Sequence, residues 1–187
     1  QTLTNKTLTA PKINENVAVT STATELNLLD GVPNATYLAI PGKTEGTNFA
    51  NSLLVGHATT GTLSSAENNT AVGINAMDAI TSGDKNTIMG FDAGTALTVG
   101  IRQTFIGNDA GKTLTGGEGN VFIGDSAGDS ANTNASSNTA VGKSALSSIG
   151  NKNYNTALGK DSGVNINAQY NLTLGYDSGD NITSGDG

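Results

Sequence analysis

Residues 69–73 read Asn-Thr-Ala-Val-Gly, and residues 155–159 read Asn-Thr-Ala-Leu-Gly. Similar pentapeptides end at a glycine every 16 to 18 residues. These repeat glycines are Gly56, Gly73, Gly90, Gly107, Gly124, Gly142, Gly159 and Gly175. Self-similarity at a fixed short period is the signature of a repeat architecture. A 17-residue period is too short for a pair of helices, so the pattern predicts an all-β solenoid of about eight coils.

Two apolar columns accompany the repeat glycines. The residue directly before each glycine is aliphatic or Met, and an apolar residue recurs seven positions after it. We expect both columns to form the solenoid core, the second on a second strand of each coil. The expected core residues are Val55, Val72, Met89, Ile106, Ile123, Val141, Leu158, Leu174, Leu63, Ile80, Leu97, Leu114, Ile149, Ile166 and Ile182.

The residue two before each repeat glycine is also mostly apolar. Neighbouring side chains on a strand point to opposite faces, and a coil has only one interior. An exposed apolar stripe would promote aggregation, so we expect this second face to pack against another copy of the chain. A threefold homotrimer is the simplest closed arrangement, with Leu54, Ile88, Phe105 and Phe122 at the interface between chains.

An asparagine begins most of the repeated pentapeptides. The members of this column are Asn69, Asn86, Asn120, Asn138, Asn155 and Asn171. Stacked strands place equivalent amides above one another, where they share hydrogen bonds as a ladder. We therefore expect a structural role for this asparagine ladder rather than recognition of a receptor.

Composition excludes several classes of function. The chain has no Cys and a single His, His57, which excludes disulfides, Cys nucleophiles and zinc sites of the His/Cys kind. The net charge of −7 has the wrong sign for wrapping a phosphate backbone, so no nucleic-acid partner is expected. No apolar run approaches the length of a membrane-spanning helix, so no membrane insertion is expected.

Local motifs point to no chemistry. Gly107–Thr113 looks like a phosphate-binding loop, but only three residues separate its glycines where the motif has four. Aspartates recur beside the turns; we expect them to cap backbone amides, with a calcium ladder as the alternative. Every loop is short, which argues against a polysaccharide-cleaving enzyme on a β-helix. The sequence thus predicts no enzyme, no cofactor, and no catalytic, cofactor-binding or metal-binding residue.

The first fifty residues have a different character. Residues 1–13 alternate apolar and polar side chains, which predicts an extended segment. Thr22 and Glu25 have capping-box spacing and Gly31 follows as a C-cap, so a short helix is expected near residues 23–30. The predicted division is an extended fibre shaft over 1–50 and solenoid repeats over 51–187, which we expect to continue beyond the C-terminus.

Two groups of motifs resemble a known family. The stretches TLTNKTLTAPKI (residues 2–13) and TATELNLLDGV (22–32) resemble shaft segments of tail fibre proteins from tailed bacteriophages. The units NTAVGINA (69–76), NTALGKDSG (155–163) and FIGNDAG (105–111) resemble repeats of phage tail fibres and bacterial fibre proteins. They are more loosely similar to the β-roll heads of trimeric autotransporter adhesins.

The resemblance implies an extracellular, virion-borne homotrimeric fibre that contributes to host attachment as a spacer or a receptor-binding surface. The partners it implies are other virion tail proteins and a host surface polysaccharide or outer-membrane protein. One alternative is a bacterial trimeric surface adhesin. Another is a monomeric ice-binding solenoid, because threonines form a column at Thr70, Thr87, Thr104, Thr139 and Thr156.

Overall fold

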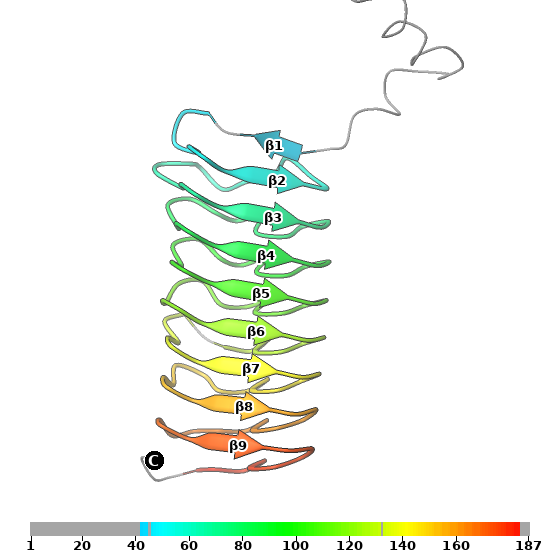
Figure 1. Cartoon of the computed structure of the whole chain (residues 1–187). Coiled ribbons are helices and arrows are strands. Elements are labelled where there is room, and N and C mark those ends of the chain that lie inside the picture. The colour runs from blue at the N-terminus through cyan, green and yellow to red at the C-terminus, as the bar shows by residue number, and fades with distance from the viewer. Residues whose placement is uncertain (1–41, 45, 132, 184–187) are drawn as a thin grey trace, which may run out of the picture. The chain divides into compact units, whose positions relative to one another are not determined.

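The computed structural model describes residues 42–44, 46–131 and 133–183, which form one nine-stranded sheet. The strands follow one another across the sheet in chain order (Figure 1). They are β1 (Gly42–Thr44), β2 (Leu53–Val55), β3 (Thr70–Val72), β4 (Thr87–Met89), β5 (Thr104–Ile106), β6 (Val121–Ile123), β7 (Thr139–Val141), β8 (Thr156–Leu158) and β9 (Leu172–Leu174). The described residues contain no helix, and the predicted all-β solenoid is confirmed. The helix expected near 23–30 lies outside the described residues.

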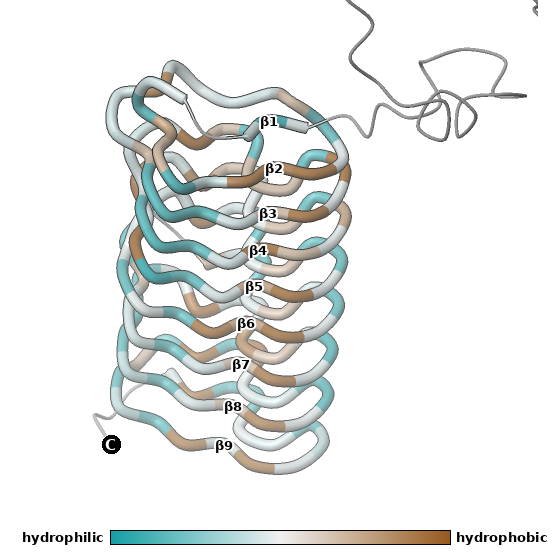
Figure 2. Tube along the Cα trace, turned by 45° about the horizontal axis from the view of Figure 1, so that its top comes forward, coloured by the Kyte–Doolittle hydropathy of each residue, from teal (hydrophilic) through white to brown (hydrophobic). Residues whose placement is uncertain are grey.

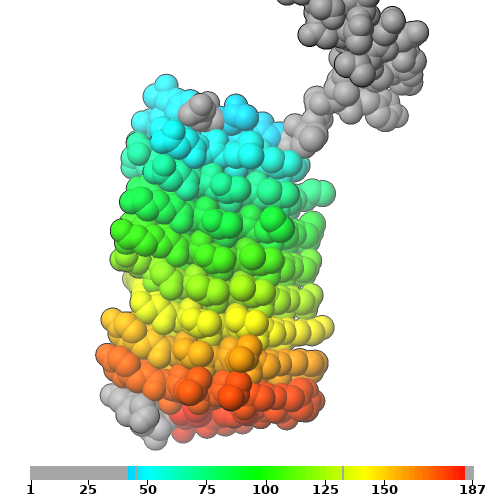
Figure 3. All heavy atoms as spheres, viewed as in Figure 1, coloured from blue at the N-terminus to red at the C-terminus, as the bar shows by residue number. Residues whose placement is uncertain are grey.

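Equivalent residues of successive repeats are stacked. Each strand from β2 to β9 pairs in parallel with its neighbour, so that Thr70 lies beside Thr87 and Ala71 beside Ile88. Because paired strands lie about 4.8 Å apart, each repeat adds one flat layer to the column (Figure 3). The length changes between repeats fall in the turns, since Val121 still pairs with Thr139 across the 18-residue step.

The two strand columns face opposite ways, but the sequence-based prediction assigned them to the wrong faces. The residue two before each repeat glycine points into the coil and is buried; this inner column is Leu54, Ala71, Ile88, Phe105, Phe122, Ala140, Ala157 and Thr173. The residue directly before the glycine lies outside, half-buried or exposed; this outer column is Val55, Val72, Met89, Ile106, Ile123, Val141, Leu158 and Leu174. The four residues expected between chains are therefore core, and the eight residues expected in the core lie on the surface.

The asparagine ladder explains which face is inside. Asn69 and Ala71 are two residues apart on one extended segment, so their side chains share a face. The Asn69 amide is buried and donates from Nδ2 to the carbonyl oxygen of Gly83, at 2.8 Å across the coil. Both strand columns are apolar, so hydrophobicity does not distinguish the faces. The buried amide does, because the coil interior supplies its carbonyl partner.

The column seven residues after the repeat glycine forms the opposite wall of the core. Its buried members are Ile80, Leu97, Leu114, Ala131, Ile149 and Ile166, while Leu63 and Ile182 pack against the core partly buried. The second strand expected in each coil is absent from the described residues, where only isolated bridges occur outside β1–β9. Left-handed backbone at Asp92 (φ 53°) and Gly94 (φ 56°) prevents an extended conformation there.

The repeat glycines set how closely the coils approach. Gly73 has φ +143°, a conformation that L side chains rarely adopt, and a Cβ there would lie 2.2 Å from the carbonyl oxygen of Gly90. A Cβ on Gly90 would meet Gly107 in the same way, again at 2.2 Å. Glycine is thus required at this corner by both backbone conformation and close approach.

β1 and residues 46–50 cover the first coil. β1 pairs antiparallel with β2, in contrast to the parallel pairs that follow. The Phe49 side chain is completely buried, and the carbonyl oxygens of Asn48 and Ala50 each accept a backbone hydrogen bond of 2.9 Å from the first coil. This segment satisfies the backbone edge of β2 and closes the end of the core.

Candidate functional site

The outer face of the sheet carries two columns of side chains along the whole solenoid. The first is the outer column. The second lies two residues before it in each coil and consists of Leu53, Thr70, Thr87, Thr104, Val121, Thr139, Thr156 and Leu172. Met89 is 48% exposed and Leu174 is 67% exposed. Hydrophobic segments recur at the strands of successive coils, one below another (Figure 2). The outer column is therefore a continuous apolar stripe that runs beside a mostly threonine column on the parallel sheet.

The asparagine ladder lies in the interior. The Asn86 Nδ2 donates to Asn69 Oδ1 at 2.9 Å, and the Asn86 backbone N–H donates to the same oxygen at 3.0 Å. Asn120 repeats both bonds to Gln103 Oε1, and Asn138 repeats them to Asn120 Oδ1. Among the described residues, no buried side-chain polar atom lacks a hydrogen-bond partner. These amides hold adjacent coils together and are not accessible to a receptor.

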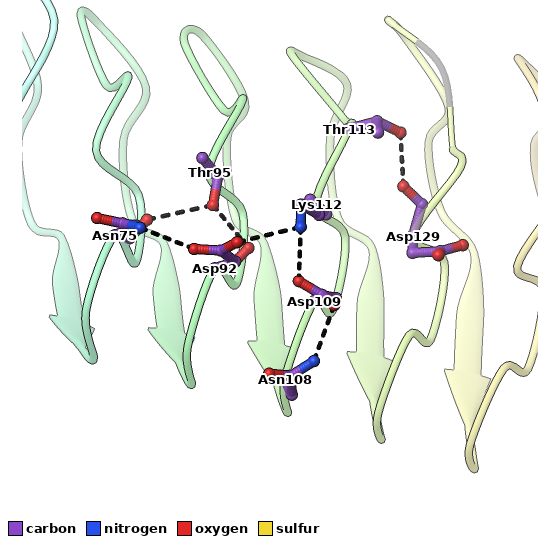
Figure 4. A network of polar contacts seen from close by, with 8 residues as sticks. All are labelled: Asn75, Asp92, Thr95, Asn108, Asp109, Lys112, Thr113 and Asp129. Carbon is purple, nitrogen blue, oxygen red and sulfur yellow. Dashed lines mark hydrogen bonds and ion pairs between the residues drawn. The ribbon is translucent and has the colours of Figure 1, made fainter.

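An ion-pair network lies beside the turn that follows the strands (Figure 4). Lys112 Nζ is 3.0 Å from Asp92 Oδ2 and 2.9 Å from Asp109 Oδ1, so one ammonium neutralises carboxylates from two adjacent coils. Asn75 Nδ2 donates to Asp92 Oδ1 at 2.9 Å. The hydrogen bond from Asn75, followed by Lys112, holds the pKa of Asp92 below its ordinary value. The carboxylates of Asp109 and Asp92 raise the pKa of Lys112.

The phosphate-loop resemblance of Gly107–Thr113 has no counterpart in the geometry. A phosphate cradle needs several backbone N–H groups that point at the ligand. Here the N–H of Asp109 donates to Phe91 at 3.0 Å and that of Gly111 donates to Ala127 at 2.9 Å, both carbonyls of neighbouring coils. The lysine of the motif is held by Asp92 and Asp109.

Two aspartates of other turns also pair with lysines. Asp125 Oδ1 lies 3.4 Å from Lys143 Nζ, and Asp161 pairs with Lys160. Burial raises the pKa of Asp129 and also that of Asp78. Within the part of the chain that the structure describes, no three His, Asp or Glu side chains lie together as metal ligands. Asp92, Asp109, Asp125 and Asp161 each lie in an ion pair with a lysine.

His57 stabilises the first turn. Its Nδ1 accepts a hydrogen bond of 3.2 Å from the backbone N–H of Thr59. With Nδ1 as acceptor, the proton of the neutral ring lies on Nε2, which then donates to the carbonyl oxygen of Ala76 at 2.9 Å. Both ring nitrogens are therefore engaged in structural contacts.

Exposed aromatic residues gather toward the C-terminal coils. Tyr154 and Tyr170 stack with ring centroids 4.9 Å apart and an interplanar angle of 2°. Lys160 Nζ lies 5.0 Å from the centroid of the Tyr176 ring. From sequence, these four residues are simply variable positions of the repeat with large side chains. Each pair is separated by 16 residues, one repeat, and this spacing is the signal that places Tyr154 directly beside Tyr170 and Lys160 beside Tyr176.

No helix among the described residues has the length and hydrophobicity needed to cross a bilayer. No protein-family model matches the chain, and neither the search of curated proteins nor that of solved structures gives a match.

Proposed function

We propose that the chain is a structural component of a homotrimeric viral tail fibre, which contributes to host-cell attachment as a spacer. The observation that carries the proposal is the outer column, a continuous row of aliphatic and Met side chains on the surface of the sheet. In this proposal the chain is not an enzyme, it lies outside the cell on a virion, and its neighbours are other tail proteins.

The outer column supports self-association on physical grounds. Soluble monomers rarely leave long contiguous apolar surfaces uncovered. The stripe runs the length of the stack, so a partner must be equally long and have the same repeat spacing. A second copy of the chain meets both conditions, and a closed ring of three copies covers every stripe. The residues that face the partner are those of the outer column, not the inner column expected from the sequence.

The uniformity of the coils supports a spacer. Burial, register and ladder hydrogen bonds repeat from coil to coil, and each coil adds about 4.8 Å of length. Such a stack holds its ends at a fixed separation. The resemblance of residues 2–13 and 22–32 to shaft segments of phage tail fibres is consistent with this role.

The test is the native mass of the purified chain by light scattering, together with an outer-column variant. The wild type is expected at three times its chain mass of 18.7 kDa. Ile106→Lys places a charge in the outer column, where the side chain is 36% exposed, and is expected to dissociate the assembly with its folding retained. Val99→Lys is the matched control, since Val99 is 50% exposed but lies away from the strands. A monomeric wild type, or equal masses for both variants, overturns the proposal.

One alternative uses the same face. The threonine column Thr70, Thr87, Thr104, Thr139 and Thr156 lies on the outer face, as an ice-binding sheet requires, although Val121 and Leu172 interrupt it. Thermal hysteresis by a monomer would favour that function. The bacterial adhesin alternative shares the trimer, and a membrane anchor in the same gene would favour it.

A further inference from the structure

The position five residues before each repeat glycine has an unusual backbone. In all eight coils its φ lies between 52° and 68°, in the left-handed region; the residues are Asn51, Asn68, Lys85, Arg102, Gly119, Ser137, Tyr154 and Tyr170. Asn and Gly adopt this conformation readily, whereas a bulky side chain there is an outlier. Lys85 and Arg102 also place large side chains there, and two successive coils carry tyrosines, Tyr154 and Tyr170, although the backbone favours Asn or Gly. Such strain is retained where the side chain has a use.

The two tyrosines form a rigid aromatic platform. The rings are parallel to within 2°, with Tyr154 50% exposed and Tyr170 55% exposed. The backbone N–H of Tyr154 donates to Ser136 at 3.2 Å, and that of Tyr170 donates to Asn153 at 3.4 Å. The backbone beneath both rings is thus fixed by the coil above. A ligand that binds them has little ordering entropy to overcome.

The other residues at the position five before the repeat glycine leave one face of the Tyr154 ring uncovered. Tyr170 covers the opposite face of the ring, and the next residues of the column along the stack are Ser137 and Gly119. Ser137 is small and exposed, and a Cβ on Gly119 would meet no atom within 4 Å. The next large side chain of the column is that of Arg102, which pairs with Glu118 three coils before Tyr154.

The residues directly before the two tyrosines carry uncharged amides. The residues that precede the two tyrosines, Asn153 and Gln169, are both half-buried amides. Asn153 Oδ1 accepts a hydrogen bond of 2.8 Å from the backbone N–H of Ser136, which orients that side chain. Amide groups both donate to and accept from hydroxyls. A stacking ligand with several hydroxyls and no charge fits this combination.

We propose that the Tyr154–Tyr170 platform binds a neutral hexopyranose unit of a polysaccharide. The C–H groups on the apolar face of a pyranose carry partial positive charge, and the face of a phenol ring is the negative part of its quadrupole. Sugar hydroxyls at the ring edge then hydrogen bond to Asn153, Gln169 and Ser137. This inference rests on the proposed attachment role and assigns it a ligand class and a location. It does not require three chains.

The test is binding of the full chain to an array of immobilised neutral hexose oligosaccharides, with uronic-acid and sialylated members as charged comparisons. The double variant Tyr154→Asn/Tyr170→Asn introduces the residue that the same position has at Asn51 and Asn68. Because Asn tolerates positive φ better than Tyr, its urea midpoint is expected to be unchanged or higher. Its binding to neutral members is expected to fall at least tenfold. A platform that only stabilised the fold would give a lower midpoint instead.

Two controls separate the outcomes. Lys85→Asn makes the same kind of change at the same backbone position, away from the tyrosines, and Tyr176→Asn removes an exposed ring outside the stack; both are expected to keep binding. Native mass is measured for every variant. A monomeric wild type that binds sugar rejects the trimer and keeps the site. Binding to charged oligosaccharides alone, or to none, overturns the site. So does a double variant that binds neutral members as well as the wild type does, or one whose native mass differs from that of the wild type.

Discussion

The ring of Phe105 occupies the space that a side chain on Gly111 would need. A Cβ on Gly111 would lie 2.6 Å from Cε2 of Phe105. Where the inner column has Ala71, the residue equivalent to Gly111 is Met77, which is fully buried with φ 60°. The coil interior is thus filled from two positions, the inner column and the residue four after the repeat glycine. A large side chain at one of them requires a small residue at the other. Ala140 with Leu146 repeats the second arrangement.

This complementarity predicts a rescue. Phe105→Ala is expected to lower the free energy of unfolding by about 3–5 kcal/mol, because a cavity replaces the ring. Gly111→Met alone is expected to abolish folding, since the new side chain overlaps the ring. Phe105→Ala combined with Gly111→Met reproduces the Ala71–Met77 pair and is expected to be more stable than either single variant. Urea unfolding of the three proteins measures this. A double variant whose free energy of unfolding does not exceed that of the more stable single variant contradicts the prediction.

The asparagine ladder predicts a large cost for one amide. Asn120→Ala removes the acceptor for Asn138 and the Nδ2 donor to Gln103 Oε1. Each buried group left without a partner costs about 1–3 kcal/mol, so a loss of roughly 3 kcal/mol or more is expected. Asn151→Ala is the control, since Asn151 is exposed and its side chain accepts one hydrogen bond of 3.5 Å from Asn134. Equal urea midpoints for the two variants would show that the ladder adds nothing to stability.

The Lys112 network predicts a pH-dependent contribution to stability. The lowered pKa of Asp92 means that its contribution is present above the unfolded pKa of about 3.9 and is lost as pH falls through the folded value. The raised pKa of Lys112 means that its contribution is present below about 10.4 and is lost as pH rises through the folded value. The pair therefore stabilises the fold between about pH 4 and pH 10.

The measurement is the urea midpoint of Lys112→Met against the wild type at pH 7 and pH 2.5. The variant is expected to be less stable at pH 7, and the difference is expected to vanish at pH 2.5. Lys143→Met is the control, because its 3.4 Å pair with Asp125 is more exposed and contributes less. The contribution of Asp78 to the pH dependence of stability has the opposite sign, because burial raises its pKa and protonation in acid removes the cost of burying its charge. That contribution is the same in the wild type and the variant. A difference that persists at pH 2.5 would show that packing of the lysine stem is responsible.

The period, the strands and their parallel stacking could be predicted from sequence because one pentapeptide recurs at nearly constant spacing. The inside of the coil could not be predicted from hydrophobicity, since Ile88 and Met89 are both apolar. It could have been predicted from Asn86, because the ladder amide needs buried carbonyl partners and must point into the coil. Side chains alternate along a strand, so Ile88 then points inward and Met89 outward. The second strand was wrong because left-handed backbone at Asp92 and Gly94 interrupts it. Asp and Gly favour that conformation and recur at these two positions of the repeat, so the sequence did carry a signal for it.

The proposed tyrosine platform could be predicted only in part. Repeat spacing places Tyr154 beside Tyr170, but their positive φ is visible only in the structure. The residues at the same position in other coils, such as Asn68 and Gly119, favour that conformation. Lys85, Arg102, Tyr154 and Tyr170 depart from that preference, and only the two tyrosines lie in adjacent coils with their rings stacked.

The repeat glycines allow backbone strain to be separated from steric overlap. Gly90 has φ +138° and a Cβ there would lie 2.2 Å from the carbonyl oxygen of Gly107, whereas Gly175 has φ +110° and a Cβ would meet nothing within 4 Å. Gly175→Ala is therefore expected to cost only the strain of a disfavoured φ, about 1–3 kcal/mol. Gly90→Ala has the same strain and must also push two coils apart, so the parallel pairing of β4 and β5 is expected to be lost. Circular dichroism and urea unfolding of the two variants measure the difference. Equal losses would mean that backbone strain alone, and not the close approach of the coils, requires glycine at this corner.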